Sequence, residues 1–178
     1  MLCLTALKTG MRLGELIALT WGDIDLLDGH IRVRRSYTNG VLGPTKNRQV
    51  RTVDIIPELV KALGAWWGEQ GKPDESVLVF QREDTGGYIE SWMAIYRLRK
   101  AMVEAGVPVV GKTTPAKRGF HSFRHTYAKV ALEQGTELYH LSRHLGHSSQ
   151  AVTDLTYGHW GRKAAKAQTA KLAGAFSV

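Results

Sequence analysis

Residues 30–56 read HIRVRRSYTNGVLGPTKNRQVRTVDII and carry the clearest strand signals in the chain. Apolar and basic residues alternate over 30–37, which is the period of a half-buried strand. Asn39 and Gly40 follow, a pair that is typical of a hairpin turn. Residues 50–56 then alternate again. The pattern predicts a small antiparallel sheet with a basic polar face.

Helical spacing dominates the rest of the sequence. Apolar residues recur at helical intervals over residues 2–8, 12–19, 57–71, 91–105, 121–133, 136–146 and 149–157, and an Ala/Lys-rich tail helix is expected from about Arg162. A further short strand is expected at 77–80. The predicted fold class is therefore α+β, mostly helical with a small antiparallel sheet.

Length and composition indicate one globular domain over residues 1–178. Of these 178 residues, 43% are hydrophobic and 22% are charged, so a core can form without disulfides. The single cysteine, Cys3, cannot form an intramolecular bridge, which favours a reducing compartment. The apolar residues 1–7 are too few for a spanning helix and follow no basic segment. We expect a soluble, cytoplasmic protein without a membrane anchor.

The net charge of +8 comes from the second half of the chain. Residues 1–89 contain 11 Lys and Arg against 11 Asp and Glu, whereas residues 90–178 contain 13 against 5. A local basic excess binds polyanions such as nucleic acids, because Lys and Arg displace the counterions of the phosphates. The alternative is a basic face that contacts only solvent.

An arginine and a glutamate lie three residues apart at the start of the second predicted helix. This spacing lets Glu15 orient the guanidinium of Arg12, which then forms a rigid fork for an anion. The alternative for Arg12 is an ordinary exposed side chain.

The segment His121-Ser122-Phe123-Arg124 begins another predicted helix. His121 and Arg124 share one helix face, and Ser122 is expected to be the N-cap. A proton-transfer group and a bidentate cation would thus lie at the positive end of a helix, where phosphate binds readily. The alternative is that His121 is a structural histidine.

Histidine spacing also raises the question of a metal site. His121 and His125 are four residues apart, and His140, His144 and His147 cluster further on. Neither group contains an H-E-x-x-H pattern, and no cysteine or carboxylate at ligand spacing completes a site. We therefore expect no metal.

The segment Leu145-Gly146-His147 is followed, ten residues after the histidine, by Tyr157. A tyrosine at the end of a short helix, near histidines and arginines, can act as an attacking phenol. The alternative is that Tyr157 packs in the core, as most tyrosines do.

Lys46 lies between the hairpin turn and the last predicted strand. From this position a flexible ammonium can reach a DNA backbone as a point charge or a proton donor. The alternative is a solubilising side chain. Other basic residues that we expect to contact DNA are Arg32, Arg34, Arg48, Lys117 and Arg118.

These motifs occur in a characteristic order over residues 9–157. The arginine helix comes first, followed by the hairpin lysine, H-x-x-R, Leu-Gly-His and a tyrosine near the end. This order resembles the tyrosine recombinase family, also called the phage integrase family. The resemblance implies that the active-site set is Arg12, Lys46, His121, Arg124 and His147, with Tyr157 as the nucleophile and Glu15 as the acid that supports the first arginine.

The resemblance also implies a function. Members of this family are site-specific recombinases or integrases that cleave and rejoin DNA through a 3′-phosphotyrosyl intermediate, without metal or cofactor. The expected partners are double-stranded DNA and other recombinase subunits, contacted in part by the tail helix. The family normally carries an N-terminal helical DNA-binding domain, so the chain is expected to be a catalytic-domain fragment. The interval from His147 to Tyr157 is one residue longer than the commonest form.

Two other functions remain open. A type IB topoisomerase shares the tyrosine and the basic set, although its pattern commonly has lysine at the position of His121. A noncatalytic DNA-binding module would use the basic residues without chemistry at Tyr157.

Overall fold

The computed structural model describes residues 1–107, 119–147, 149–158 and 160. The helices are α1 (Leu2–Thr9), α2 (Leu13–Ile17), α3 (Pro57–Glu69), α4 (Ser91–Glu104), α5 (Phe120–Glu133) and α6 (Leu138–Leu145), with a 3-10 turn η1 (Trp21–Asp23). Residues 150–158 are also helical. The strands are β1 (Ile24–Asp25), β2 (His30–Val33), β3 (Arg35–Thr38), β4 (Val41–Pro44) and β5 (Arg51–Asp54). The α+β class and its helices are confirmed, while the expected tail helix lies outside the described residues.

The strands form two antiparallel sheets in place of the single expected one. One sheet has the order β1-β2-β5, and β3 and β4 form a separate hairpin. The Asn39-Gly40 turn is confirmed, because Thr38 pairs with Val41. The continuous strand expected at 30–37 was wrong, since it breaks at Arg34. The side chains of Arg34 and Arg35 both bind the Asp23 carboxylate at the point where the chain passes from one sheet to the other.

The short strand expected at 77–80 was also wrong. Leu78 makes only an isolated bridge to Thr20. Val79 is nevertheless fully buried, and its backbone N–H donates to the Leu19 carbonyl at 2.9 Å. The apolar run therefore supplies core residues without extending into a ladder.

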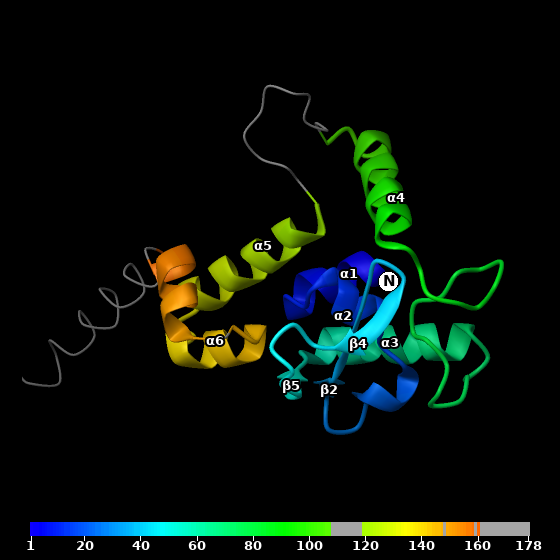
Figure 1. Ribbon diagram of the computed structural model, residues 1–178, viewed down its shortest axis with the longest axis horizontal. Helices are drawn as coiled ribbons and strands as arrows, with labels where there is room; N and C mark the ends of the chain where they lie inside the picture. Colours follow the sequence, from blue (N-terminus) through cyan, green and yellow to red (C-terminus); the bar gives the residue numbers. More distant parts are fainter. Residues whose placement is uncertain (108–118, 148, 159, 161–178) are drawn as a thin grey trace, which may run out of the picture.

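The core consists of two main clusters. The larger one packs α1, α2, α3, α4 and the three-stranded sheet together through residues that include Leu16, Ile31, Val53, Leu59 and Leu63. The second joins α5, α6 and the 150–158 helix through Ala128, Leu132, Leu141, Leu145 and Tyr157. Figure 1 shows these three helices gathered on one side of the molecule, beside α1 and α2.

Gly10 lies where the two clusters meet. It ends α1 with a left-handed backbone of φ 65°, a conformation that glycine adopts without strain. A β-carbon here would lie 2.8 Å from the Tyr127 ring and 2.9 Å from Leu145. Helix α1 can therefore approach α5 and α6 closely, which brings the motifs of the two halves together. Within the described residues, no helix is long and apolar enough to span a membrane.

Candidate active site

Arg12 and Glu15 form the predicted pair. Glu15 is 2% exposed, and its carboxylate accepts from Arg12 Nη1 and from the Arg12 backbone N–H, each at 3.0 Å. Burial tends to raise the pKa of Glu15, but the hydrogen bonds and charges of Arg51 and Arg12 outweigh burial and hold this pKa below its ordinary value. Glu15 is therefore an anion that fixes the Arg12 fork.

Arg51 is a site residue that sequence reasoning missed. Its Nη1 and Nη2 donate to the two Glu15 oxygens at 3.0 and 2.7 Å, and its Nε donates to the His144 carbonyl at 2.8 Å. Arg51 therefore connects β5, α2 and α6. The alternation of the strand could have indicated this, because residues two apart in a strand share one face, and Arg51 shares the face of Val53, which is buried.

Arg124 meets Arg12 at the end of α6. Arg124 is 2% exposed, and its Nη1 and Nη2 donate to the carbonyls of Gly10 at 2.9 Å and Leu145 at 2.8 Å. Arg12 donates to the same Leu145 carbonyl at 3.5 Å and to Gly146 at 3.1 Å. Burial, with the charge of Arg12, lowers the pKa of Arg124 to about 10, so this group remains a cation at neutral pH.

His121 lies in the first turn of α5. The sequence predicted that Ser122 is the N-cap of this helix, and this prediction was wrong. Gly119 has that position, and its backbone N–H donates to Ser122 Oγ at 3.2 Å. With Arg12 and Arg124, His121 lines a pocket of about 340 Å³. Burial and the neighbouring His125 lower the pKa of His121, so its ring is mainly neutral at neutral pH and has one nitrogen without a proton.

Tyr157 is buried among histidines. It is 2% exposed, and the His147 ring lies nearly parallel to it at 12°, with centroids 6.3 Å apart. The His125 ring contacts both Tyr157 and His121, with its centroid 5.5 Å from that of Tyr157 and 5.0 Å from that of His121. Burial raises the pKa of Tyr157, while the charges of Arg124 and Arg12 oppose this increase. The sequence had indicated His125 only as a metal candidate, although its i+4 spacing from His121 places both on one helix face.

Lys46 is exposed in the loop between β4 and β5. The next residue, Asn47, donates through Nδ2 to the Gly146 carbonyl at 3.0 Å. The loop that bears Lys46 is thereby attached to the same backbone segment that holds Arg12.

The other expected DNA contacts divide into three kinds. Arg32 and Arg48 are exposed. Arg34 is ion-paired with Asp23, so part of its charge is already neutralised. Lys117 and Arg118 lie outside the described residues.

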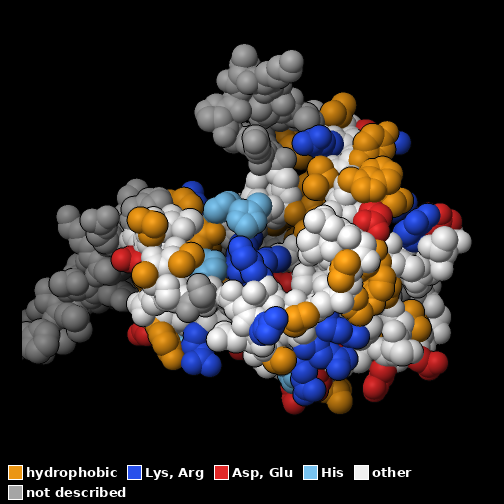
Figure 2. Space-filling view, viewed as in Figure 1, with side chains coloured by type: hydrophobic (Ala, Val, Ile, Leu, Met, Phe, Trp, Pro, Cys, Tyr) orange, Lys and Arg blue, Asp and Glu red, His pale blue; other side chains and the backbone are white. Residues whose placement is uncertain are grey.

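A groove of about 890 Å³ runs beside this arrangement. Its lining includes the arginines Arg12, Arg32, Arg51 and Arg143, the histidines His140, His144 and His147, and the carboxylate of Asp54. Figure 2 shows blue and pale-blue side chains gathered in the hollow between the α5 and α6 side of the molecule and the remainder. Cations exceed carboxylates in this lining, as expected for a surface that binds a polyanion.

The described histidines His140, His144 and His147 each contact a different neighbour. His144 Nε2 donates to the Thr9 carbonyl at 2.8 Å, His140 faces Glu137 at 3.7 Å, and His147 Nδ1 lies 2.6 Å from Thr153 Oγ. Each of these three rings therefore has its own polar contact.

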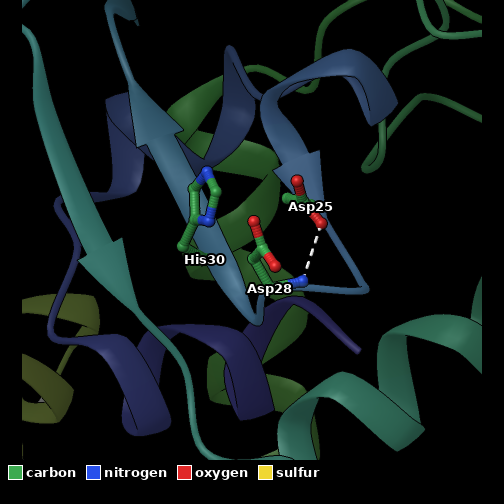
Figure 3. A group of neighbouring side chains, drawn as sticks. All are labelled: Asp25, Asp28 and His30. Atoms are coloured by element: carbon green, nitrogen blue, oxygen red, sulfur yellow. Dashed lines mark hydrogen bonds between the residues drawn. The ribbon is translucent and has the colours of Figure 1, made fainter.

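Within the described part of the chain, one group of three potential metal ligands occurs, formed by Asp25, Asp28 and His30. It lies at the turn between β1 and β2 (Figure 3). Asp25 Oδ1 accepts the backbone N–H groups of Leu27 and Asp28, each at 2.9 Å. These bonds explain the placement of Asp25 as part of the turn.

Known structures share this fold. The XerA recombinase is 27% identical, with a TM-score of 0.68 over 85% of this chain and 50% of that one. The Tn1549 transposon integrase, at 21% identity, has a TM-score of 0.77 over 96% of this chain and 57% of that one. The catalytic domain of bacteriophage HP1 integrase, at 24% identity, has a TM-score of 0.58 over 89% of this chain and 73% of that one. The fold is thus that of a tyrosine recombinase catalytic domain.

The sequence comparison identifies the family. Residues 1–163 match the phage integrase family, and the chain belongs to it. A tyrosine recombinase XerC-like protein of Caldanaerobacter subterraneus subsp. tengcongensis is 31% identical over 89% of this chain and 44% of its own length. The ICEBs1 integrase of Bacillus subtilis is 30% identical over 86% of this chain and 43% of its own length. The chain therefore spans less than half the length of these two relatives.

Proposed function

We propose that this chain is the catalytic domain of a site-specific DNA recombinase that cleaves and rejoins DNA through a 3′-phosphotyrosyl intermediate. The observation that carries this proposal is the position of Tyr157, buried against His147 and near the charges of Arg124 and Arg12. Family membership supports it. DNA as the substrate is supported by the DNA-bound structures of the Tn1549 integrase and the XerH site-specific recombinase.

The reaction exchanges one phosphodiester for another. Tyr157 Oη attacks the phosphorus, the bond from phosphorus to the 5′-oxygen breaks, and a 3′-phosphotyrosyl link and a 5′-hydroxyl remain. Attack by the 5′-hydroxyl of a partner strand reverses the step. Arg12 and Arg124 stabilise the charge on the nonbridging oxygens, where fixed cations have a large effect, and His147 donates a further hydrogen bond. These groups make the reaction independent of metals and cofactors.

Two protons move during cleavage. A phenol is a poor nucleophile at neutral pH unless it loses its proton, and burial makes this loss harder for Tyr157. His121 accepts that proton directly or by relay, and the His125 ring, which contacts both residues, supports a relay. Lys46 donates a proton to the leaving 5′-oxygen, which guanidinium groups can hardly do.

We also propose that recombination takes place in a DNA-bound multimer, whereas the isolated domain is a monomer or weakly associated. Two exposed apolar side chains on the 150–158 helix, Leu155 at 90% and Val152 at 43% exposure, support contact with another subunit. The alternatives make different predictions. A type IB topoisomerase would relax supercoils without exchanging partners, and a DNA-binding module would form no covalent link.

Covalent trapping tests the proposal. A pool of duplexes with random sequence around a nick removes the need to know the target site, and adducts are separated on denaturing gels. The wild-type protein should form an adduct that survives addition of a metal chelator. Tyr157→Phe should abolish the adduct but retain DNA binding, because only a hydroxyl is lost. Tyr139→Phe is the matched control, since Tyr139 is 48% exposed and should be dispensable.

Several results would contradict the proposal. An adduct with Tyr157→Phe would mean that another residue is the nucleophile. DNA binding by the wild type without any adduct would favour the binding module. Relaxation without transfer to a partner strand that bears a free 5′-hydroxyl would favour the topoisomerase, and loss of cleavage with the chelator would refute metal independence.

A further inference from the structure

The backbone at His147 is held by the end of α6. Gly146 ends this helix in a left-handed conformation of φ 67°, and the His147 N–H donates to the Ser142 carbonyl at 3.1 Å. These contacts determine where the residue lies. They do not determine which ring nitrogen carries the proton.

The His147 ring has a close polar contact with Thr153. Its Nδ1 lies 2.6 Å from Thr153 Oγ. Thr153 is fully buried, with an exposed fraction of 0%, and lies one helical turn before Tyr157. The same ring lies nearly parallel to Tyr157. Thr153 therefore contacts His147 from the helix that also carries the nucleophile.

Burial favours one direction for this hydrogen bond. The Thr153 hydroxyl cannot donate to bulk water, and an unpaired buried donor is costly. Among the described residues, the acceptor found for this hydroxyl is His147 Nδ1. A nitrogen that accepts a hydrogen bond carries no proton, so in a neutral ring the proton lies on Nε2.

The ring is neutral under ordinary conditions. Burial and the charges of Arg124 and Arg12 lower the pKa of His147 to about 4. A neutral imidazole has only one N–H, so a single tautomer decides which side of the ring can donate. His147 lines the same groove as Arg12, where DNA phosphates would lie.

We propose that Thr153 is a positioning residue that holds His147 in the Nε2–H tautomer and keeps its ring aligned with Tyr157. The consequence for catalysis rests on the proposed function, in which Nε2–H donates to a nonbridging phosphate oxygen. The tautomer itself is a property of the free protein. The two can therefore be tested separately.

The first test measures the tautomer. Long-range ¹H–¹⁵N spectra of the 178-residue chain at neutral pH report the state of each His147 nitrogen. Wild type and Thr153→Ser, which keeps the hydroxyl, should have Nε2 protonated and Nδ1 as a hydrogen-bond acceptor. Thr153→Val, which has nearly the same shape, should show the Nδ1 signal move away from the hydrogen-bonded position. A proton on Nδ1 in the wild type, or identical spectra for Val and wild type, would overturn the proposal.

The second test measures the rate of covalent trapping. Thr153→Val should react about tenfold more slowly, which corresponds to one lost hydrogen bond, whereas Thr153→Ser should stay within about threefold. In a His147→Ala background, Thr153→Val should cause no further loss, because Thr153 acts through His147. An equal loss in both backgrounds would show a general packing role and refute the proposal. If no variant traps DNA while the spectra are as expected, the proposed function fails and the tautomer assignment stands.

Discussion

Arg51 shows that the candidate site also depends on residues for which we propose no catalytic role. Its guanidinium forms a two-point pair with Glu15, and the pair is largely buried, with side-chain exposures of 11% and 1%. A buried pair adds little net stability compared with apolar residues, but removal of one partner leaves an uncompensated charge. Because Glu15 also orients Arg12, loss of Arg51 should affect both stability and catalysis.

We predict that Arg51→Ala lowers the free energy of unfolding by about 3 kcal/mol, measured by urea denaturation. The matched control is Arg48→Ala, an exposed residue whose loss should change stability by less than about 0.5 kcal/mol. Because the pKa of Glu15 is lowered in the folded protein, the pair contributes its full stabilisation at pH values above the ordinary pKa of a glutamate. This contribution is lost as the pH falls through the lower, folded-state pKa. Equal stability of the two variants would contradict this account.

The end of α6 organises the site at the level of elements. The last carbonyls of a helix lack partners within it and form the negative end of its dipole. The carbonyls of Leu145 and Gly146 accept from Arg12, and Leu145 also accepts from Arg124. The left-handed Gly146 exposes these carbonyls. The Leu-Gly-His motif thus combines a helix end that binds two arginines with His147, for which we propose a catalytic role.

We predict that Gly146→Ala is more harmful than Gly106→Ala. Both glycines have a φ of +67°, but a β-carbon at 146 would lie 3.0 to 3.1 Å from the Arg51 side chain, whereas one at 106 has nothing within 4 Å. Both variants should lose about 1 kcal/mol of stability from backbone strain. Only Gly146→Ala should also slow covalent trapping, because Arg51 must move. Equal trapping rates for the two variants would argue against the role of Arg51.

At the scale of the whole molecule, two separate groups of elements form the cationic groove. Arg32 comes from β2 and Arg143 from α6, and both line the same groove. Each cation that contacts a phosphate releases counterions when DNA binds. The number of such contacts can therefore be read from the salt dependence of binding.

We predict that Arg32→Ala reduces the slope of log K against log salt by about one, measured by fluorescence anisotropy on duplex DNA. The control is Arg82→Ala, because Arg82 pairs with Asp84 and does not line the groove. Its slope should match that of the wild type. An unchanged slope for Arg32→Ala would remove Arg32 from the DNA-binding surface.

Local elements were predictable because their signals are local. Helical spacing indicated α3, α4, α5 and α6, and Asn39-Gly40 indicated the β3–β4 turn, which the structure confirms. The break at Arg34 was not predictable in this way. It depends on Asp23, a residue 11 positions earlier, whose approach to the strand is a tertiary contact.

The sequence by itself determined the order and identity of the motif residues, the fold class and the pairing of Arg12 with Glu15, because these depend on residue type and short spacing. Only the tertiary structure brought Arg12 and Arg124 to one carbonyl, Tyr157 against both His147 and His125, and Arg51 onto Glu15. The arginine contacts join positions far apart in the chain, and they link the N-terminal elements to α5 and α6, whereas the Tyr157 contacts form inside the second core cluster. Spacing along a chain carries no information about such distances, which are decided by how the two core clusters pack.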